Sequence, residues 1–279
     1  MGAGAENTGG GRVREEPPEL AGPRPSRARI FDHYLGGSDH FRIDCEAADE
    51  ADQVFPAAEQ LCRDHRRFSR AVVRHLCEAG IDQFLELGSG LPTVDHVHTV
   101  AARHAPERRV VYVDHDPDTA EHATRLVADE PGVAVECVDA TDVSAVLGTP
   151  GVRALIDLHR PVAVLAVALL HLIADEAARA MVHGYREAVA PGSAIALSHP
   201  TGLARPDLTA WRDFPHTGLS VAPILRDPGD MSLWLAGTEL VGPGWTSAPE
   251  WTPDGPATGP EVTGSGVWGV VARVPGARG

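Results

Sequence analysis

The chain has 279 residues, 43% of them hydrophobic, and a formal net charge of −15 at pH 7. This length and composition allow a sizeable core, which excludes an intrinsically disordered protein, and the acidity is a poor match for a nucleic-acid backbone. The chain contains no lysine, which excludes Schiff-base chemistry and the phosphate-binding lysine of Walker-type sites. We therefore expect a globular protein with no nucleic-acid partner.

Cysteine spacing and hydropathy bear on the cellular compartment. Cys45, Cys62, Cys77 and Cys137 are too far apart for a CxxC motif and favour free thiols. The N-terminus lacks the apolar segment of a signal peptide, and the longest apolar run, 162–170, is too short to span a bilayer. We expect a cytoplasmic protein without a membrane segment.

The first 80 residues divide into two parts. Residues 1–25 are rich in glycine and proline, which predicts a disordered leader. Residues 26–80 predict an N-terminal helical cap, in which the Ser26 side chain caps a helix that ends at Gly36. The three helices predicted in this cap span 27–35, 44–53 and 56–79.

The rest of the chain, residues 81–279, alternates apolar strands with helices. This alternation is typical of a parallel sheet with right-handed crossovers. Near the C-terminus we expect a helix over 228–236, a strand that begins at 239 and a Gly/Pro-rich loop over 242–265. The other predicted strands are 83–87, 109–113, 134–138, 162–169, 193–198 and 267–274, and the other predicted helices are 94–104, 118–129 and 175–189.

A glycine pair follows the first predicted strand. The strand ends at Glu86, and Gly88 and Gly90 come directly before a predicted helix. Glycines at such a turn let the backbone, with its N–H groups, approach a ligand closely. The third glycine of the dinucleotide fingerprint is absent, because Thr93 stands at that position. The turn is therefore a candidate nucleotide site, although a purely structural tight turn is also compatible with the pattern.

Acidic residues follow the next two predicted strands. Asp114 lies 24 residues after Gly90, close to the spacing expected of a carboxylate that holds a ribose. Asp139 ends the third strand, where a carboxylate can accept a hydrogen bond from the exocyclic amine of adenine. The three strand ends together suit a ligand with a ribose, an adenine and a positive centre.

The sequence resembles the class I S-adenosylmethionine-dependent methyltransferases, and more closely a bacterial S-adenosyl methyltransferase family of undefined substrate. The resemblance implies a Rossmann-like α/β sheet of about seven strands, the last one antiparallel, with an N-terminal helical cap. It also implies S-adenosylmethionine as the cofactor and residues 81–279 as the domain that binds it. The segments that carry the resemblance are 25–29, 31–37, 41–44, 83–93 (QFLELGSGLPT), 110–117 (VVYVDHDP), 170–171, 190–193 and 198–199.

The resemblance assigns roles to individual positions. The methionine part of the cofactor is expected beside the first turn, the ribose beside Asp114 and the adenine beside His115 and the third strand end. His171 is expected on the methyl side. The implied cofactor-binding residues are Glu86, Gly88, Ser89, Gly90, Asp114, His115, Asp139, Ala140, Thr141 and His171, and the implied substrate-lining residues are Tyr34, Gly36 and Phe41.

Methyl transfer from a sulfonium needs a base only when the acceptor is protonated at neutral pH. His171 and His199, at the ends of the fourth and fifth strands, are candidate bases, and either can equally be structural. His96 and His98 lie two residues apart and would point in different directions on a helix. We expect no metal site.

Missing motifs narrow the methyl acceptor. No (Asn/Asp)-Pro-Pro-(Tyr/Phe) follows the fourth strand, and no cysteine follows a proline. The only asparagine, Asn7, lies in the predicted leader, so none is available for an Asp-Asp-Asn metal set. We expect methyl transfer to an oxygen, nitrogen or carbon of a small molecule, by a monomer or homodimer. The alternatives are a non-catalytic S-adenosylmethionine sensor or scaffold and, more distantly, a dehydrogenase.

Overall fold

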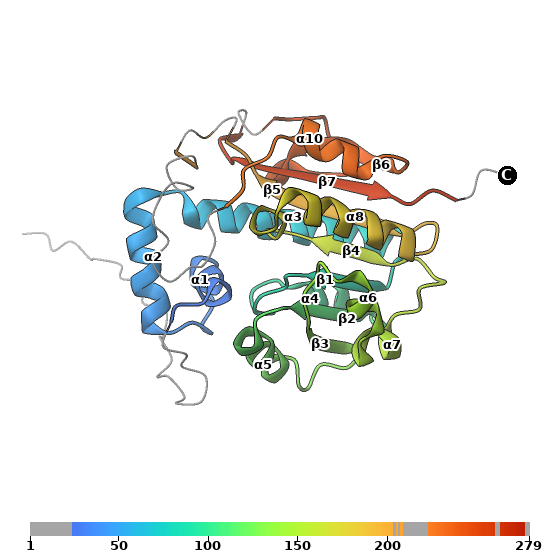
Figure 1. The fold of residues 1–279 in the computed structure, drawn as a ribbon, viewed down its shortest axis with the longest axis horizontal. Helices are drawn as coiled ribbons and strands as arrows, with labels where there is room; N and C mark the ends of the chain where they lie inside the picture. Colours follow the sequence, from blue (N-terminus) through green and yellow to red (C-terminus); the bar gives the residue numbers. More distant parts are fainter. Residues whose placement is uncertain (1–23, 203–204, 206, 209–222, 260–262, 277–279) are drawn as a thin grey trace, which may run out of the picture.

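The computed structural model describes residues 24–202, 205, 207–208, 223–259 and 263–276. They form one seven-stranded sheet with the strand order β3-β2-β1-β4-β5-β7-β6 (Figure 1). The strands β1 to β5 are parallel, and β7 runs antiparallel to both of its neighbours. The α/β sheet with an antiparallel last strand is therefore confirmed. The strands are β1 (Gln83–Leu87), β2 (Arg109–Asp114), β3 (Val133–Cys137), β4 (Ala163–Ala166), β5 (Ala194–Pro200), β6 (Glu239–Ser247) and β7 (Val267–Arg273).

Helices cover both faces of the sheet because its central strands are apolar on both sides. Side chains alternate across a strand, so that Phe84 packs into one core cluster while Leu85 and Leu87 pack into the other. The helices are α1 (Arg27–Tyr34), α2 (Arg42–Val54), α3 (Ala58–Glu78), α4 (Val97–Ala102), α5 (Pro117–Leu126), α6 (Val143–Gly148), α7 (Pro150–Leu155), α8 (Asp175–Ala188) and α10 (Pro228–Ser232), with 3₁₀ turns at Leu170–Leu172, Leu233–Leu235 and Ala248–Glu250. None of the helices in the described part of the chain is both long and apolar enough to cross a membrane.

The three N-terminal helices occupy different places. The long α3 packs against β5 and β7 and contributes Phe68, Val72 and Leu76 to a core cluster of the sheet. The shorter α1 and α2 stand beyond one end of the sheet, at the left in Figure 1. Of the predicted leader, residues 1–23 lie outside the described residues.

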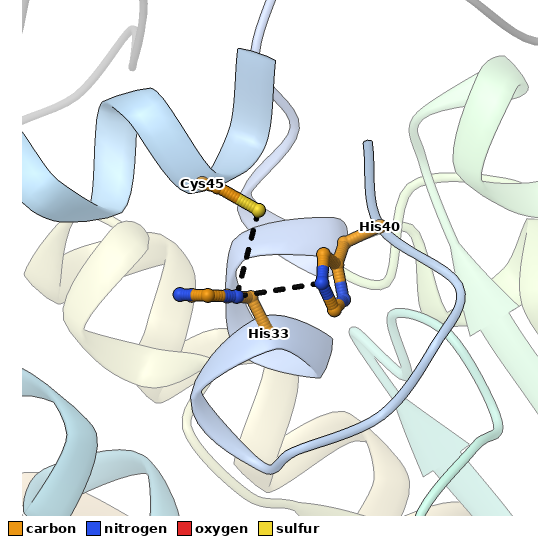
Figure 2. A group of neighbouring side chains, drawn as sticks. All are labelled: His33, His40 and Cys45. Atoms are coloured by element: carbon orange, nitrogen blue, oxygen red, sulfur yellow. Dashed lines mark hydrogen bonds between the residues drawn. The ribbon is translucent and has the colours of Figure 1, made fainter. Parts of the chain in front are cut away.

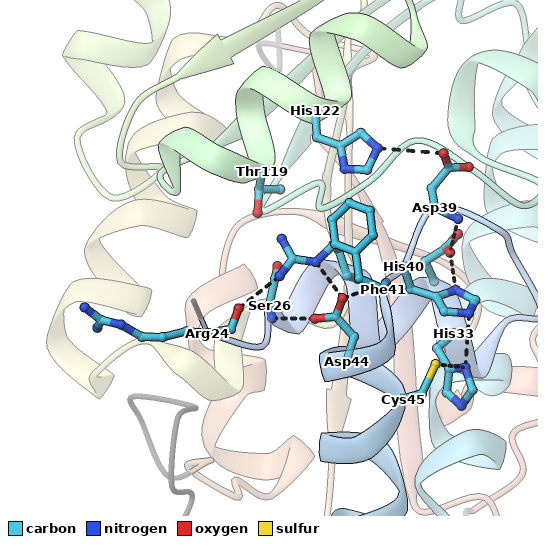
Figure 3. Close-up of polar contacts among 12 residues, drawn as sticks. Arg24, Ser26, His33, Asp39, His40, Phe41, Asp44, Cys45, Thr119 and His122 are labelled. Atoms are coloured by element: carbon cyan, nitrogen blue, oxygen red, sulfur yellow. Dashed lines mark hydrogen bonds and ion pairs between the residues drawn. The ribbon is translucent and has the colours of Figure 1, made fainter. Parts of the chain in front are cut away.

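A buried carboxylate, Asp44, ties the start of α1 to α2. It accepts hydrogen bonds from the Ser26 N–H (2.9 Å), the Arg29 Nε (2.6 Å) and the Phe41 N–H (2.9 Å) (Figure 3). The predicted Ser26 side-chain cap is wrong, because the Ser26 hydroxyl makes no capping bond. The predicted end of the helix is confirmed, since Gly36 follows it with a φ of +75°.

Three other predictions need correction. The strand β6 continues to Ser247, through the start of the loop predicted over 242–265. Two short helices, α6 and α7, occupy a stretch for which no element was predicted. The strand β4 ends at Ala166 instead of Leu169, because Ala168 takes a φ of +55°, which is incompatible with a strand.

Candidate functional site

A cleft of about 660 Å³ opens at the carboxyl ends of β1 and β2. In parallel sheets this edge is where ligands bind, and the volume is in the range of small-molecule sites. Four segments and Arg66 of α3 line it: the chain from Arg24 into α1, the end of β1 with the turn after it, the turn after β2, and the residues that follow β4. Of the predicted cofactor residues, the lining includes Glu86, Gly88, Ser89, Gly90, Asp114 and His115.

The turn after β1 depends on its two glycines. Gly88 and Gly90 have φ angles of +65° and +61°, a region that residues with a Cβ rarely adopt. A Cβ on Gly88 would lie 2.5 Å from Leu169 Cδ1, whereas one on Gly90 would lie 3.5 Å from Ala28 Cβ. The Ser89 N–H donates to the Val113 carbonyl (3.0 Å), so the turn is fastened to β2. Because neither glycine has a side chain, a ligand in this part of the cleft can approach the backbone directly.

Asp114 is held by the backbone of both turns. One carboxylate oxygen accepts from the Gly90 N–H (2.9 Å) and the other from the Asp116 N–H (3.1 Å). Burial raises the pKa of Asp114, and these two hydrogen bonds oppose the shift. Each oxygen retains acceptor capacity, so the fixed carboxylate can accept two further hydrogen bonds from a ligand in the cleft.

Glu86 forms a buried polar cluster with Arg66 and His96. Arg66 donates to His96 Nδ1 (2.5 Å), which places the imidazole proton on Nε2, 3.1 Å from Glu86 Oε2. The contact between His96 and Glu86 is short but poorly aligned, so that Glu86 Oε2 has no well-formed hydrogen bond. His96 and Arg66 nevertheless lower the pKa of Glu86 against the effect of burial. The result is a buried carboxylate with an oxygen available to a donor.

The N-terminal wall of the cleft was not predicted from the sequence. Residues 24–29, with Phe31 and Asp32, line it. Arg29 sits over the Phe41 ring (5.0 Å to the centroid) and is paired with Asp44. Arg66 of α3 also lines the cleft. The other arginines of α3 are exposed (Arg63, Arg67, Arg70 and Arg74), but Arg66 is half-buried and points inward to His96. The sequence signal that could have identified Arg66 is its helical spacing from Cys62 and Ser69, which are buried positions of α3.

Three predicted adenine-side residues follow β3 and do not line the cleft. The Val138 N–H donates to the Asp114 carbonyl (3.0 Å), which keeps this loop next to the ribose-side turn. Asp139 accepts from the Thr141 N–H and hydroxyl (both 2.8 Å), and the Tyr185 hydroxyl donates to the Ala140 carbonyl (3.0 Å). Asp139 here stabilises its own turn.

The three predicted substrate-lining residues also lie away from the cleft lining. The Tyr34 hydroxyl donates to the Asp52 carboxylate (3.0 Å) and faces α2. Phe41 is buried and stacks on His122, with 6.3 Å between ring centroids. Gly36 ends α1.

The two candidate bases lie behind the cleft in a buried histidine group. The His171 ring is 6.5 Å from that of His65 and 6.3 Å from that of His199. Burial lowers the pKa of His65 and His199 to about 3 and that of His171 well below its usual value. The three imidazoles are therefore neutral near pH 7.

A strained residue connects this group to the cleft. Ala168 lines the cleft with a φ of +55°, and its N–H donates to Ser198 Oγ (3.1 Å). Ser198 Oγ in turn lies 2.7 Å from His65 Nδ1. Strain of this kind persists only where surrounding contacts impose it, and here the His65–Ser198 pair supplies such a contact.

The sequence matches the S-adenosyl methyltransferase family over residues 13–275. The chain belongs to this family. It is similar to the crystal structure of a candidate methyltransferase from Thermobifida fusca, with 34% sequence identity and a TM-score of 0.83. The similarity covers 93% of this chain and 98% of the Thermobifida fusca chain. It is also similar to a DUF574 family protein from Streptomyces avermitilis (33% identity, TM-score 0.81), with 91% and 98% covered. No curated protein matches the chain significantly. Membership of the family agrees with the seven-stranded fold and with the resemblance described above.

Proposed function

We propose that this chain binds S-adenosylmethionine in the cleft and transfers its methyl group to an oxygen, nitrogen or carbon of a small molecule. The observation that carries the proposal is the convergence of Glu86, the Gly88–Gly90 turn and Asp114 on one cleft. Membership of the family supports the reaction class. The acceptor is proposed as a class, from the motifs that the sequence lacks.

The residues of the cleft fit this cofactor chemically. Glu86 Oε2 is buried without a well-formed hydrogen bond, and an unsatisfied buried acceptor favours a ligand that donates to it, such as an ammonium group. Asp114 can accept from two adjacent hydroxyls through its two oxygens. Both carboxylates also favour a ligand that carries positive charge.

When bound, S-adenosylmethionine supplies an activated methyl group for in-line displacement. The chain itself contributes position and exclusion of water, which in favourable cases are worth about 7–11 kcal/mol. Asp114 and the glycine turn fix one side of the cleft, and the wall formed by Arg24–Asp32 closes the other.

The roles of His171 and His199 as bases stay predictions. Each has a ring nitrogen, Nδ1, that is buried without a hydrogen-bond partner, and each is neutral near pH 7. A neutral imidazole can accept a proton, but a strongly lowered pKa makes it a weak base. For these residues to act, the acceptor would have to reach past Ala168 and Leu169, which line the cleft in front of them.

Calorimetry and product analysis test the proposal. We expect tight binding of S-adenosylmethionine and S-adenosylhomocysteine and none of NAD. Incubation with S-adenosylmethionine and a pool of metabolites should release S-adenosylhomocysteine with a methylated product, detected by mass spectrometry. Binding without turnover across broad acceptor pools would favour the sensor alternative, and tight NAD binding would overturn the assignment of the cofactor.

A further inference from the structure

We infer that His33, His40 and Cys45 form a zinc site that ties α1 to α2. The three residues come from the end of α1, the following loop and the first turn of α2, and Figure 2 shows their side chains converging. Among the described residues they are the group of His, Cys, Asp and Glu side chains whose ligand atoms all lie within 4.8 Å of one another. The inference does not depend on the proposed function.

The distances match a tetrahedral metal centre. With Zn–N bonds of about 2.05 Å and a Zn–S bond of about 2.3 Å, tetrahedral geometry separates two nitrogens by about 3.4 Å and a nitrogen from a sulfur by about 3.6 Å. His33 Nδ1 lies 3.4 Å from His40 Nε2 and 3.6 Å from Cys45 Sγ. The remaining pair, Cys45 Sγ and the ligand nitrogen of His40, is within 4.8 Å, so closing the site requires at most about 1.2 Å of movement.

The hydrogen bonds of the site fix a ligand-competent tautomer. His40 Nδ1 lies 2.9 Å from Asp32 Oδ2, and a carboxylate can only accept, so the His40 proton is on Nδ1. The Nε2 lone pair is therefore free and faces His33. A carboxylate that orients a metal-binding histidine in this way is typical of zinc sites.

Without a metal, one hydrogen bond satisfies only one of these two contacts. A proton on His33 Nδ1 can donate to His40 Nε2 or to Cys45 Sγ, but not well to both, because the two partners lie in different directions. A zinc ion accepts a lone pair from each of the three atoms. On binding, the Cys45 S–H bond breaks, the sulfur electrons form the Zn–S bond and the proton leaves to solvent.

The local sequence brings the three ligands together. Gly36 follows the end of α1 and has a φ of +75°, which turns the chain back toward Asp32. The approach is so close that a Cβ on Gly37 would lie 1.9 Å from Asp32 Oδ1. This turn places His40 beside His33. Cys45 follows Asp44, whose buried hydrogen bonds fix the start of α2 (Figure 3). With His33 and Cys45 half-buried and three protein ligands, a fourth position remains for water.

Zinc content and cobalt spectroscopy of the full chain, prepared without a polyhistidine tag, test the site. We expect one zinc per chain after incubation and dialysis, and a thiolate-to-cobalt charge-transfer band when Co²⁺ replaces Zn²⁺. Cys45→Ser should abolish that band, and His40→Gln should lose the zinc. Cys137→Ser, which removes an exposed thiol elsewhere, should retain both. Asp32→Asn should weaken zinc binding about 10–100-fold.

The wild-type spectrum tests the zinc site even if a variant fails to fold. Background zinc content and no charge-transfer band in the wild-type chain would overturn the site. Full zinc content and an unchanged band in folded Cys45→Ser would overturn it as well, because the metal would then lie elsewhere.

Discussion

At the scale of single residues, Asp114 is the most direct test of ligand binding. Asp114→Asn keeps the shape but removes the charge, so we expect S-adenosylmethionine binding to weaken by about 1.5–3 kcal/mol, or about 10–150-fold. Asp129→Asn is a matched control, because that carboxylate is exposed at the far end of the α5 region. Titration calorimetry measures both. An unchanged dissociation constant in Asp114→Asn would refute the role of this carboxylate.

Alanine variants of two glycines distinguish the effect of backbone strain on stability from the effect of a cleft contact on ligand binding. Gly80→Ala and Gly88→Ala both place a Cβ at positive φ, which costs about 1–2 kcal/mol of stability. Only at Gly88 does the new atom displace a side chain of the cleft, that of Leu169. We expect both variants to lose stability in urea unfolding but only Gly88→Ala to weaken S-adenosylmethionine binding. Equal dissociation constants would mean that the ligand does not approach this turn.

The residues that the sequence could predict are those at strand ends. Glu86 and Asp114 could be placed together because parallel strands end at one edge of a sheet. Helix faces were less predictable: Phe31 and Asp32 line the cleft, whereas Tyr34, two residues later, turns its hydroxyl to α2. Which face of α1 lines the cleft depends on the hydrogen bonds of Asp44, which are long-range contacts with no local sequence pattern.

At the scale of elements, the buried pair of Arg29 and Asp44 holds α1 against α2. Both side chains are at most 5% exposed, and removal of one partner of a buried pair typically costs about 3–5 kcal/mol. We expect Asp44→Ala to lower the free energy of unfolding by that amount and to speed hydrogen exchange over residues 24–44. Glu46→Ala, which removes an exposed partner of Arg42, should cost less than about 0.5 kcal/mol. Equal losses in the two variants would contradict this view of the cap.

Element boundaries were predicted correctly where the residues at the boundary differ clearly from those of the element. The strand β1 was predicted to the residue because its apolar residues lie between Asp82 and the turn that begins at Gly88. The strand β6 was predicted only to its first residues, since Gly242, Pro243 and Gly244 are typical of a loop. It continues because it is an edge strand, which tolerates proline, and its pairing with β7 shifts register between Val241 and Thr246.

At the scale of the whole molecule, buried imidazoles make the fold sensitive to mild acid. Burial lowers the pKa of His96 to about 4 and that of His65 and His199 to about 3, whereas an unfolded histidine titrates near 6.5. Below pH 6.5 the unfolded chain binds protons that the folded chain does not. The free energy of unfolding therefore falls as the pH falls from 6.5 toward these lowered values, by up to about 1.4 kcal/mol per pH unit for each histidine.

Urea unfolding between about pH 7 and pH 5 measures this slope. Asp64 and Asp114 act in the opposite sense, because burial raises the pKa of both carboxyls, so the histidine contribution is read from the difference in slope between variants. His199→Gln should reduce the slope by about one proton, whereas His104→Gln, which changes an exposed side chain, should leave it unchanged. An identical slope in His199→Gln and the wild-type chain would show that His199 is not buried as a neutral group.

A crystal structure of the full chain with S-adenosylhomocysteine would show directly whether the cleft binds the cofactor. We predict the nucleoside in the cleft, its ribose hydroxyls on the Asp114 carboxylate and its amino-acid portion beside Glu86 and the Gly88–Gly90 turn. A nucleoside bound at another edge of the sheet, or a cleft filled by side chains while the ligand lies elsewhere, would refute cofactor binding by Glu86, the glycine turn and Asp114.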